Sequence, residues 1–341
     1  MSGYKSWCQS APENVEKLMH ATAGAVEKVY GGGTLRRLGR PFLVGSGTAY
    51  AAALAANQAF ADLTGWSGEW VRVMTAQEYA RMAGEAVLGA GAAWVLLVDL
   101  DGDAMTLSAA QTARDHGAHL TVITRDGAGA AAGLADGVVP LPAGTGATAE
   151  DFVAAQLAPA QLALAAGLAH GRMTDGELSA RRREMSDYMK ACCRAALEAQ
   201  PQLDALARGA ARRVRCWETM GTGPDYAVAW AARALVYEHL GTVCTVEETE
   251  DWLHVNFLQL TPEEFGTLLF ISQNNPSAER SLRTARYVEG VGRTTVVITD
   301  AAAQELPQGA SVLSLPPAPA LWMQPLGTLW PAALLLEAMS S

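Results

Sequence analysis

The segment 96–110, LLVDLDGDAMTLSAA, places acidic side chains where a strand–turn–helix unit usually binds an anion. An apolar strand runs to Val98, and a helical pattern begins near Met105. Backbone N–H groups and the helix dipole favour a negatively charged ligand at such a turn. This chain instead carries three carboxylates and a glycine there: Asp99, Asp101, Gly102 and Asp103. The segment predicts either an altered ligand loop or a plain turn with an aspartate that caps the next helix.

A second turn, GSGTAY at residues 45–50, occurs in two versions at one constant offset. Residues 42–54 read FLVGSGTAYAAAL and residues 218–230 read ETMGTGPDYAVAW. The matching residues are Gly45, Gly47 and Tyr50 in the first copy and Gly221, Gly223 and Tyr226 in the second. The chain is therefore predicted to contain a duplication. The motif lacks the third glycine of a dinucleotide fingerprint, and no acidic residue clearly ends the next strand, so a nucleotide site is not favoured.

Each half reads as short β-rich runs that alternate with helical stretches, which predicts βαβ units and a parallel sheet. The fold class is therefore α/β, with two tandem doubly wound domains plus N-terminal and linking helices. We predict an N-terminal helical segment at 1–34 and a first domain at 35–170. Linking helices at 171–209 and a second domain at 210–341 follow.

Composition narrows the classes of partner. The 341 residues carry a formal net charge of −10, which argues against nucleic acid or an anionic membrane surface as the main partner. Five cysteines, an odd number without CxxC spacing, favour reduced thiols. The apolar run 152–169 suits a buried helix better than a membrane span. No secretory signal is visible near the start, and we expect a cytoplasmic protein.

The half that opens with GSGTAY resembles the sugar isomerase (SIS) domain. Two such halves in tandem, with GTGPDYAVAWAARALVYEHL and EDWLHVN in the second, are similar to the isomerase portion of glucosamine-6-phosphate synthase. They are also similar to fructoselysine-6-phosphate deglycase and the amino-sugar-phosphate deaminases. The resemblance implies flavodoxin-like domains, a sugar or sugar-phosphate ligand, and no cofactor or metal. It also implies a homodimer or larger assembly with sites near the subunit interface.

The resemblance assigns two catalytic residues. The glutamate on the long helix after the second glycine turn matches Glu238, and the ring-opening histidine of the family matches His254. The glycine that follows this histidine in the family is Val255 here. A carboxylate beside apolar neighbours can move a proton between C1 and C2 of an open-chain sugar. An imidazole can assist ring opening near neutral pH. Either residue alone could instead be structural or solvent-facing.

The resemblance also implies a ligand-binding set on the first domain: Ser46, Gly47, Thr48, Asp99, Asp101 and Gly102. The family has a Ser-Gln-Ser-Gly-Glu-Thr phosphate loop where this chain has residues 99–104, DLDGDA, so every hydroxyl is replaced. A carboxylate and a phosphate both only accept hydrogen bonds, and two charges about 4 Å apart repel by roughly 4 kcal/mol at an effective dielectric constant near 20. We therefore expect a neutral or cationic group at this end of the ligand, as in an unphosphorylated sugar, an amino sugar or an amine-bearing glycoconjugate.

Two functions follow as alternatives. The first is an isomerase, deglycase or deaminase type of enzyme that uses Glu238 as the base and His254 as the ring opener. The second is a protein that binds or senses a carbohydrate derivative without turnover. The three aspartates would also suit Mg²⁺ by their oxygen chemistry, but the family uses no metal and we predict none.

Overall fold

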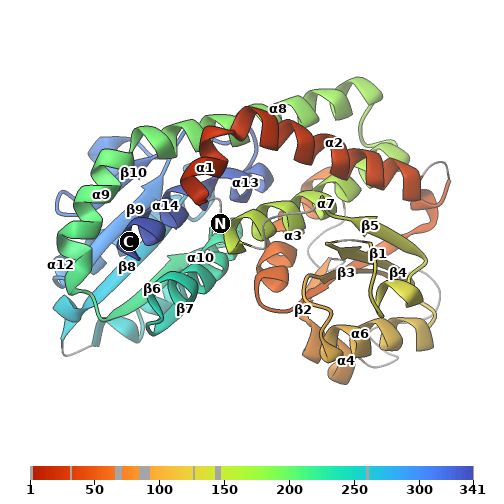
Figure 1. The fold of residues 1–341 in the computed structure, drawn as a ribbon, viewed down its shortest axis with the longest axis horizontal. Coiled ribbons are helices and arrows are strands. Elements are labelled where there is room, and N and C mark those ends of the chain that lie inside the picture. Colours follow the sequence, from red (N-terminus) through yellow and green to blue (C-terminus); the bar gives the residue numbers. More distant parts are fainter. Residues whose placement is uncertain are drawn as a thin grey trace. The chain divides into compact units, whose positions relative to one another are not determined.

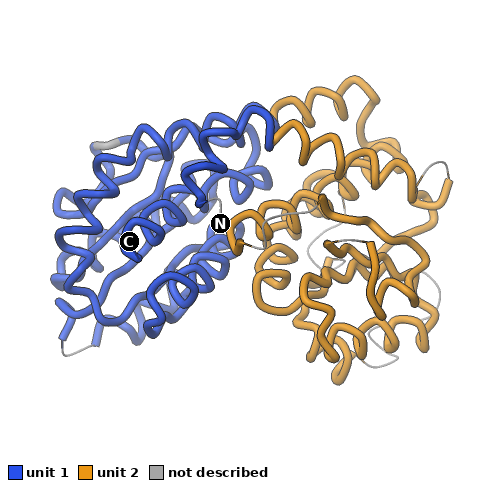
Figure 2. The backbone as a smooth tube through the Cα atoms, in the orientation of Figure 1, with its two compact units in different colours: residues 1–14, 185–341 blue, residues 15–184 orange. Residues whose placement is uncertain are grey.

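The computed structural model describes residues 3–30, 33–65, 71–83, 93–125, 127–142, 147–258 and 261–340. The chain divides into two compact units, each with its own parallel sheet (Figures 1 and 2). Unit 2 comprises residues 15–184, and unit 1 comprises residues 1–14 and 185–341. Helices α2 (Ala11–Val29) and α8 (Asp175–Glu198) each contribute residues to both units.

Unit 2 has a five-stranded parallel sheet in the order β2-β1-β3-β4-β5. Its central strand, β3, is buried along its whole length, as is usual for a parallel sheet covered by helices on both faces. The strands are β1 (Gly39–Gly45), β2 (Arg72–Thr75), β3 (Ala93–Asp99), β4 (His119–Thr124) and β5 (Gly137–Pro140).

Helices cover both faces of this sheet. On one face α4 (Ala76–Met82) and α6 (Ala104–Asp115) pack against Val95, Leu97 and Val122. On the other face α3 (Thr48–Thr64) packs against α7 (Thr148–Ala169) and contacts Trp94 through Phe60. Alanine dominates the buried side of α3, which lets the backbones of α3 and α7 approach closely.

Unit 1 repeats this architecture with the order β10-β9-β8-β6-β7. The strands are β6 (Cys216–Gly221), β7 (Cys244–Glu248), β8 (Phe265–Ile271), β9 (Thr294–Thr299) and β10 (Ser311–Ser314). The helices of this unit are α1 (Tyr4–Gln9), α9 (Gln200–Arg208), α10 (Pro224–Leu240), α11 (Thr249–Trp252), α12 (Ala278–Gly290), α13 (Pro325–Thr328) and α14 (Trp330–Met339). Numbered from the first strand of each unit, both sheets have the order 2-1-3-4-5, so the predicted duplication and the predicted fold class are confirmed.

Short 3-10 helices complete the connections. Unit 2 contains Leu35–Arg37 and Ala132–Leu134. Unit 1 contains Ala210–Arg213, Asn256–Leu258, Pro262–Glu264, Ala303–Glu305 and Leu321–Met323.

Helix α7 is long and apolar enough to cross a membrane, and it is the single helix of that kind in the described part of the chain. Most of its residues are buried in unit 2. A core helix passes the same test of length and composition, and the prediction of a buried helix at 152–169 agrees with this placement.

The first glycine of each GxG turn has no room for a side chain, which gives a test of the fold. A Cβ at Gly45 would lie 2.6 Å from the carbonyl carbon of Ala49 and 2.8 Å from the nitrogen of Tyr50. We expect Gly45→Ala to lower the free energy of unfolding by about 2 kcal/mol or more, because the backbone must shift. Gly24→Ala, at a helical position with no atom within 4 Å, should instead raise it by roughly 0.5–1 kcal/mol. Urea unfolding of the two variants measures both changes, and equal effects would contradict the packing argument.

Candidate ligand site

The predicted ligand residues of unit 2 meet at the carboxyl ends of two paired strands. The segment Ser46–Thr48 follows β1 and the segment 99–103 follows β3, and these strands pair in parallel with Val44 opposite Leu97. The sheet order reverses between β1 and β3, and doubly wound proteins bind their ligands at this switch point. Their proximity supports the grouping made from the sequence, while their role as ligand contacts stays a prediction.

The glycine turn has the same backbone shape in both units. Gly47 adopts φ 56° and ψ −124°, and Gly223 adopts φ 58° and ψ −125°. Positive φ favours glycine at both positions. No side chain caps the N-terminus of α3, and the N–H groups of Ala49 and Tyr50 donate to the carbonyl of Ser46 at 3.0 and 3.4 Å.

The acidic loop satisfies its own backbone donors. Oδ1 of Asp99 accepts a hydrogen bond from the N–H of Gly102 at 2.8 Å. Asp103 is the N-cap of α6, and its Oδ1 accepts from the N–H groups of Met105 at 2.7 Å and Thr106 at 2.8 Å. The hydroxyl of Thr106 donates to the other oxygen of Asp103 at 2.7 Å. Side-chain carboxylates thus already occupy donors that a phosphate would need at this turn, and for Asp103 the capping alternative is correct.

Burial and charge shape the titration of these aspartates. Asp99 is only 4% exposed, and burial raises the pKa of its carboxyl group, with Asp103 and Asp101 adding to the increase. Burial alone would also raise the pKa of Asp103, but the hydrogen bonds from Thr106 and Met105 outweigh it and lower that pKa. Asp101 is exposed and projects its charge into solvent beside the loop.

One cation beside this loop was not among the residues predicted from the sequence. Arg125 follows β4 and donates from Nε to the carbonyl of Leu100 at 2.8 Å and from Nη1 to Asp151 at 2.5 Å. Its Nη2 lies 3.7 Å from Asp101. Its place at the end of the β-rich run LTVITR (120–125) was the available signal. One guanidinium faces several carboxylates here, so the loop remains negative overall.

The switch point of unit 1 contains a buried carboxylate instead of an open turn. Asp225, 1% exposed, accepts hydrogen bonds from the N–H of Ser272 at 3.1 Å, the hydroxyl of Ser272 at 2.8 Å and Nδ2 of Asn275 at 2.9 Å. Burial raises the pKa of Asp225 to about 7, although these donors oppose the shift. Three donors that could bind a ligand anion therefore hold a side chain of the protein.

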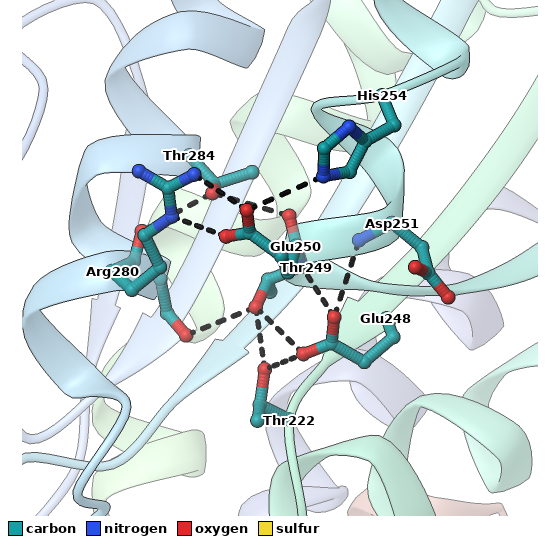
Figure 3. A network of polar contacts seen from close by, with 9 residues as sticks. Thr222, Glu248, Thr249, Glu250, Asp251, His254, Arg280 and Thr284 are labelled. Carbon is teal, nitrogen blue, oxygen red and sulfur yellow. Dashed lines mark hydrogen bonds and ion pairs between the residues drawn. The ribbon is translucent and has the colours of Figure 1, made fainter.

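His254 lies in a polar network on unit 1 (Figure 3). Its Nε2 is 3.5 Å from Oε1 of Glu250, which also pairs with Arg280, and the imidazole is 70% exposed. The nearby Glu248 caps α11 through the N–H groups of Glu250 and Asp251, and it accepts from Thr222. The pKa of Glu250 is lowered, chiefly by the hydrogen bond from Arg280. His254 is thus held next to a carboxylate while its ring remains open to solvent.

Glu238 and His254 lie on opposite faces of the sheet of unit 1. The side chain of Thr219 donates to Ala229 of α10, so α10 and its Glu238 cover the face of Thr219. The next residue, Met220, points to the other face and packs against Trp252, two residues before His254. Glu238 is exposed on the last turn of α10 and accepts a 3.4 Å hydrogen bond from the hydroxyl of Tyr4. One copy of unit 1 therefore does not bring the two predicted catalytic groups together.

The buried carboxylate of unit 1 predicts a pH dependence of stability. A raised pKa means that the folded protein binds more protons than the unfolded chain between about pH 4 and 7, so the free energy of unfolding falls as pH rises through that window. Relative to Asp225→Asn, the wild type should lose roughly 3 kcal/mol between pH 4.5 and 7.5. Urea unfolding across this range measures the difference. Asp187→Asn, at an exposed position on α8, serves as the control, and a parallel pH trend for Asp225→Asn and the wild type would contradict the prediction.

No family model and no curated protein sequence matches the chain. Among solved structures, the C-terminal domain of glucosamine-fructose-6-phosphate aminotransferase from Francisella tularensis matches with a TM-score of 0.85 at 15% identity, covering 100% of this chain and 96% of that one. Tagatose-6-phosphate ketose/aldose isomerase from Escherichia coli matches with a TM-score of 0.69 at 15% identity, covering 99% and 90%. Glucosamine-6-phosphate deaminase from Thermotoga maritima matches with a TM-score of 0.62 at 15% identity, covering 94% and 92%. The chain has the tandem sugar isomerase fold.

Proposed function

We propose that this protein is an enzyme of the sugar isomerase, deglycase or deaminase type that acts on a sugar or sugar phosphate. The observation that carries the proposal is the pairing of the turn Ser46–Thr48 with the loop 99–103 at the switch point of unit 2. The three solved structures reported above are all named for 6-phosphosugar enzymes, which supports a sugar derivative as the ligand.

The proposed chemistry uses Glu238 and His254. Glu238 would transfer a proton between C1 and C2 of the open-chain sugar, and His254 would assist ring opening. The imidazole is exposed and held near a carboxylate, an arrangement that leaves it free to reach a ligand. No cofactor or metal enters this mechanism.

A second copy of the chain completes the proposed site. Glu238 and His254 lie on opposite faces of one sheet, so a ligand that contacts both needs His254 from a neighbouring subunit. The segment around His254 exposes large apolar side chains, namely Val255, Phe257 and Leu258, which favours a protein contact at this surface. A homodimer or larger assembly is therefore part of the proposal.

We infer that the ligand group recognised at the switch point of unit 2 is neutral or carries an amine. Ser46 and Thr48 offer hydroxyl groups to a sugar, and Asp99 and Asp101 offer acceptors to hydroxyl or ammonium groups. The filled donors of the loop 99–103 and its net negative charge oppose a phosphate. The alternative is a carbohydrate-binding or sensing protein without turnover, which the self-satisfied loop also favours.

Ligand binding can be tested by thermal shift with sugars, amino sugars and their 6-phosphates, because a ligand that prefers the folded state raises the midpoint of unfolding. We expect amino sugars or neutral sugars to stabilise the protein more than the matching 6-phosphates. Asp101→Asn, at an exposed position, should shift the preference toward the phosphates without loss of the fold. Strong stabilisation of the wild type by a 6-phosphate would contradict the charge argument.

The catalytic role is tested by turnover of a sugar that binds. Glu238→Gln should lower kcat by about a hundredfold or more, because the general base is lost while the shape remains. Glu263→Gln changes another exposed glutamate of unit 1 and should leave kcat within twofold. A normal rate for Glu238→Gln would exclude Glu238 as the base, and binding without turnover in the wild type would favour the sensor alternative.

A further inference from the structure

A buried ion pair lies beneath the turn that carries His254. Glu218, in the middle of β6, pairs with Arg293, which precedes β9, and the two side chains are 2% and 1% exposed. The guanidinium carbon lies 4.8 Å from the ring centroid of Trp252 and 5.2 Å from that of Phe265. Charged side chains at such buried positions need an explanation, since apolar residues usually fill them.

The pair is bonded to both sides of the turn. The indole N–H of Trp252 donates to Oε2 of Glu218 at 2.9 Å, and Nδ2 of Asn256 donates to Oε1 at 3.0 Å. Nη2 of Arg293 donates to the carbonyl of Asn256 at 2.9 Å. Trp252 precedes His254 by two residues and Asn256 follows it by two, so the three-residue turn 253–255 is fixed at each end.

Stability alone does not account for this arrangement. A buried ion pair contributes about as much as an apolar pair of similar volume, or less, because desolvation opposes the attraction. An apolar pair cannot offer two carboxylate oxygens to two donors, or an N–H group to a backbone carbonyl. The particular effect of Glu218 and Arg293 is therefore directional: they set where the backbone enters and leaves the turn.

We propose that Glu218 and Arg293 are positioning residues that hold the exposed imidazole of His254 in one orientation toward its ligand. This inference rests on the proposed role of His254 in the function above. Neither residue touches the ligand in this account; each acts through Trp252 and Asn256. The contact between His254 and Glu250 then orients the ring on a backbone that is already fixed.

Hydrogen exchange tests the anchor without any assumption about activity. Asn256→Ala and Trp252→Phe each remove one donor to Glu218 and leave the ion pair in place. We expect the amides of Leu253, His254 and Leu258, which bond to nearby carbonyls, to exchange about two- to tenfold faster in each variant. Asn274→Ala, which removes a comparable 2.7 Å amide bond to Ala318 in the same unit, should leave them unchanged. Unchanged exchange in Asn256→Ala and Trp252→Phe would overturn the proposal.

A double replacement separates positioning from stability. Glu218→Gln alone leaves the charge of Arg293 poorly compensated and is expected to destabilise the unit. Glu218→Met with Arg293→Met leaves no unpaired charge and should unfold at a higher temperature than Glu218→Gln alone, while the same amides exchange faster than in the wild type. Slow exchange in this double variant would show that the ion pair does not set the turn.

Kinetics with a converted sugar from the thermal-shift panel distinguishes this inference from the proposed function. Asn256→Ala should lower kcat at least fivefold, in the same direction as His254→Ala, with KM changed less than twofold. A full rate in Asn256→Ala beside a large loss in His254→Ala would overturn the positioning role and leave the proposed function intact. A full rate in His254→Ala would remove the catalytic role of His254, while the exchange data would still decide whether the pair anchors the turn.

Discussion

The structure depends on carboxylates that fill the hydrogen-bond donors at the carboxyl edges of both sheets. In unit 2 the side chains of Asp99 and Asp103 accept the N–H groups of their own loop, and in unit 1 three donors hold Asp225. Donors that could bind a ligand anion thus already bind carboxylate side chains of the protein. Any ligand at these edges must be recognised by groups other than these donors, and this constraint favours hydroxyl and ammonium groups over phosphate.

The two units fill these donors with carboxylates from different positions, although their backbones have the same fold. The glycine turns have nearly the same φ and ψ, so the copies share their geometry. In unit 1 the carboxylate, Asp225, belongs to the helix turn and Ser272 follows the strand. In unit 2 Ala49 takes the helix position and Asp99 ends the strand. Both carboxylates are buried, but Asp99 of unit 2 lies beside the exposed Asp101, which is why the ligand site is proposed at unit 2.

The sequence allowed the main features of the fold to be predicted, for physical reasons. Glycines at fixed spacing mark turns that need positive φ, and the buried strand β3 is a continuous apolar run. The edge strands β2 and β5 do not stand out in the sequence, because they are four residues long and only partly buried. Arg125 was missed because its contacts with Asp151 and Leu100 join segments that are distant in sequence. The separation of Glu238 from His254 depends on which face each connection crosses, which a motif alone does not reveal.

The separation of Glu238 from His254 explains why the buried pair Glu218–Arg293 matters for function. On the face of α10 the predicted base extends from a helix whose position is set by packing against β6 and α14. On the other face the predicted ring opener extends from a short turn, and a turn has few backbone hydrogen bonds of its own to resist motion. A group that must act on a ligand beside another subunit needs a fixed direction as well as exposure. The bonds from Glu218 and Arg293 to Trp252 and Asn256 supply that direction, which is why a buried charge pair at this position is more informative about function than about stability.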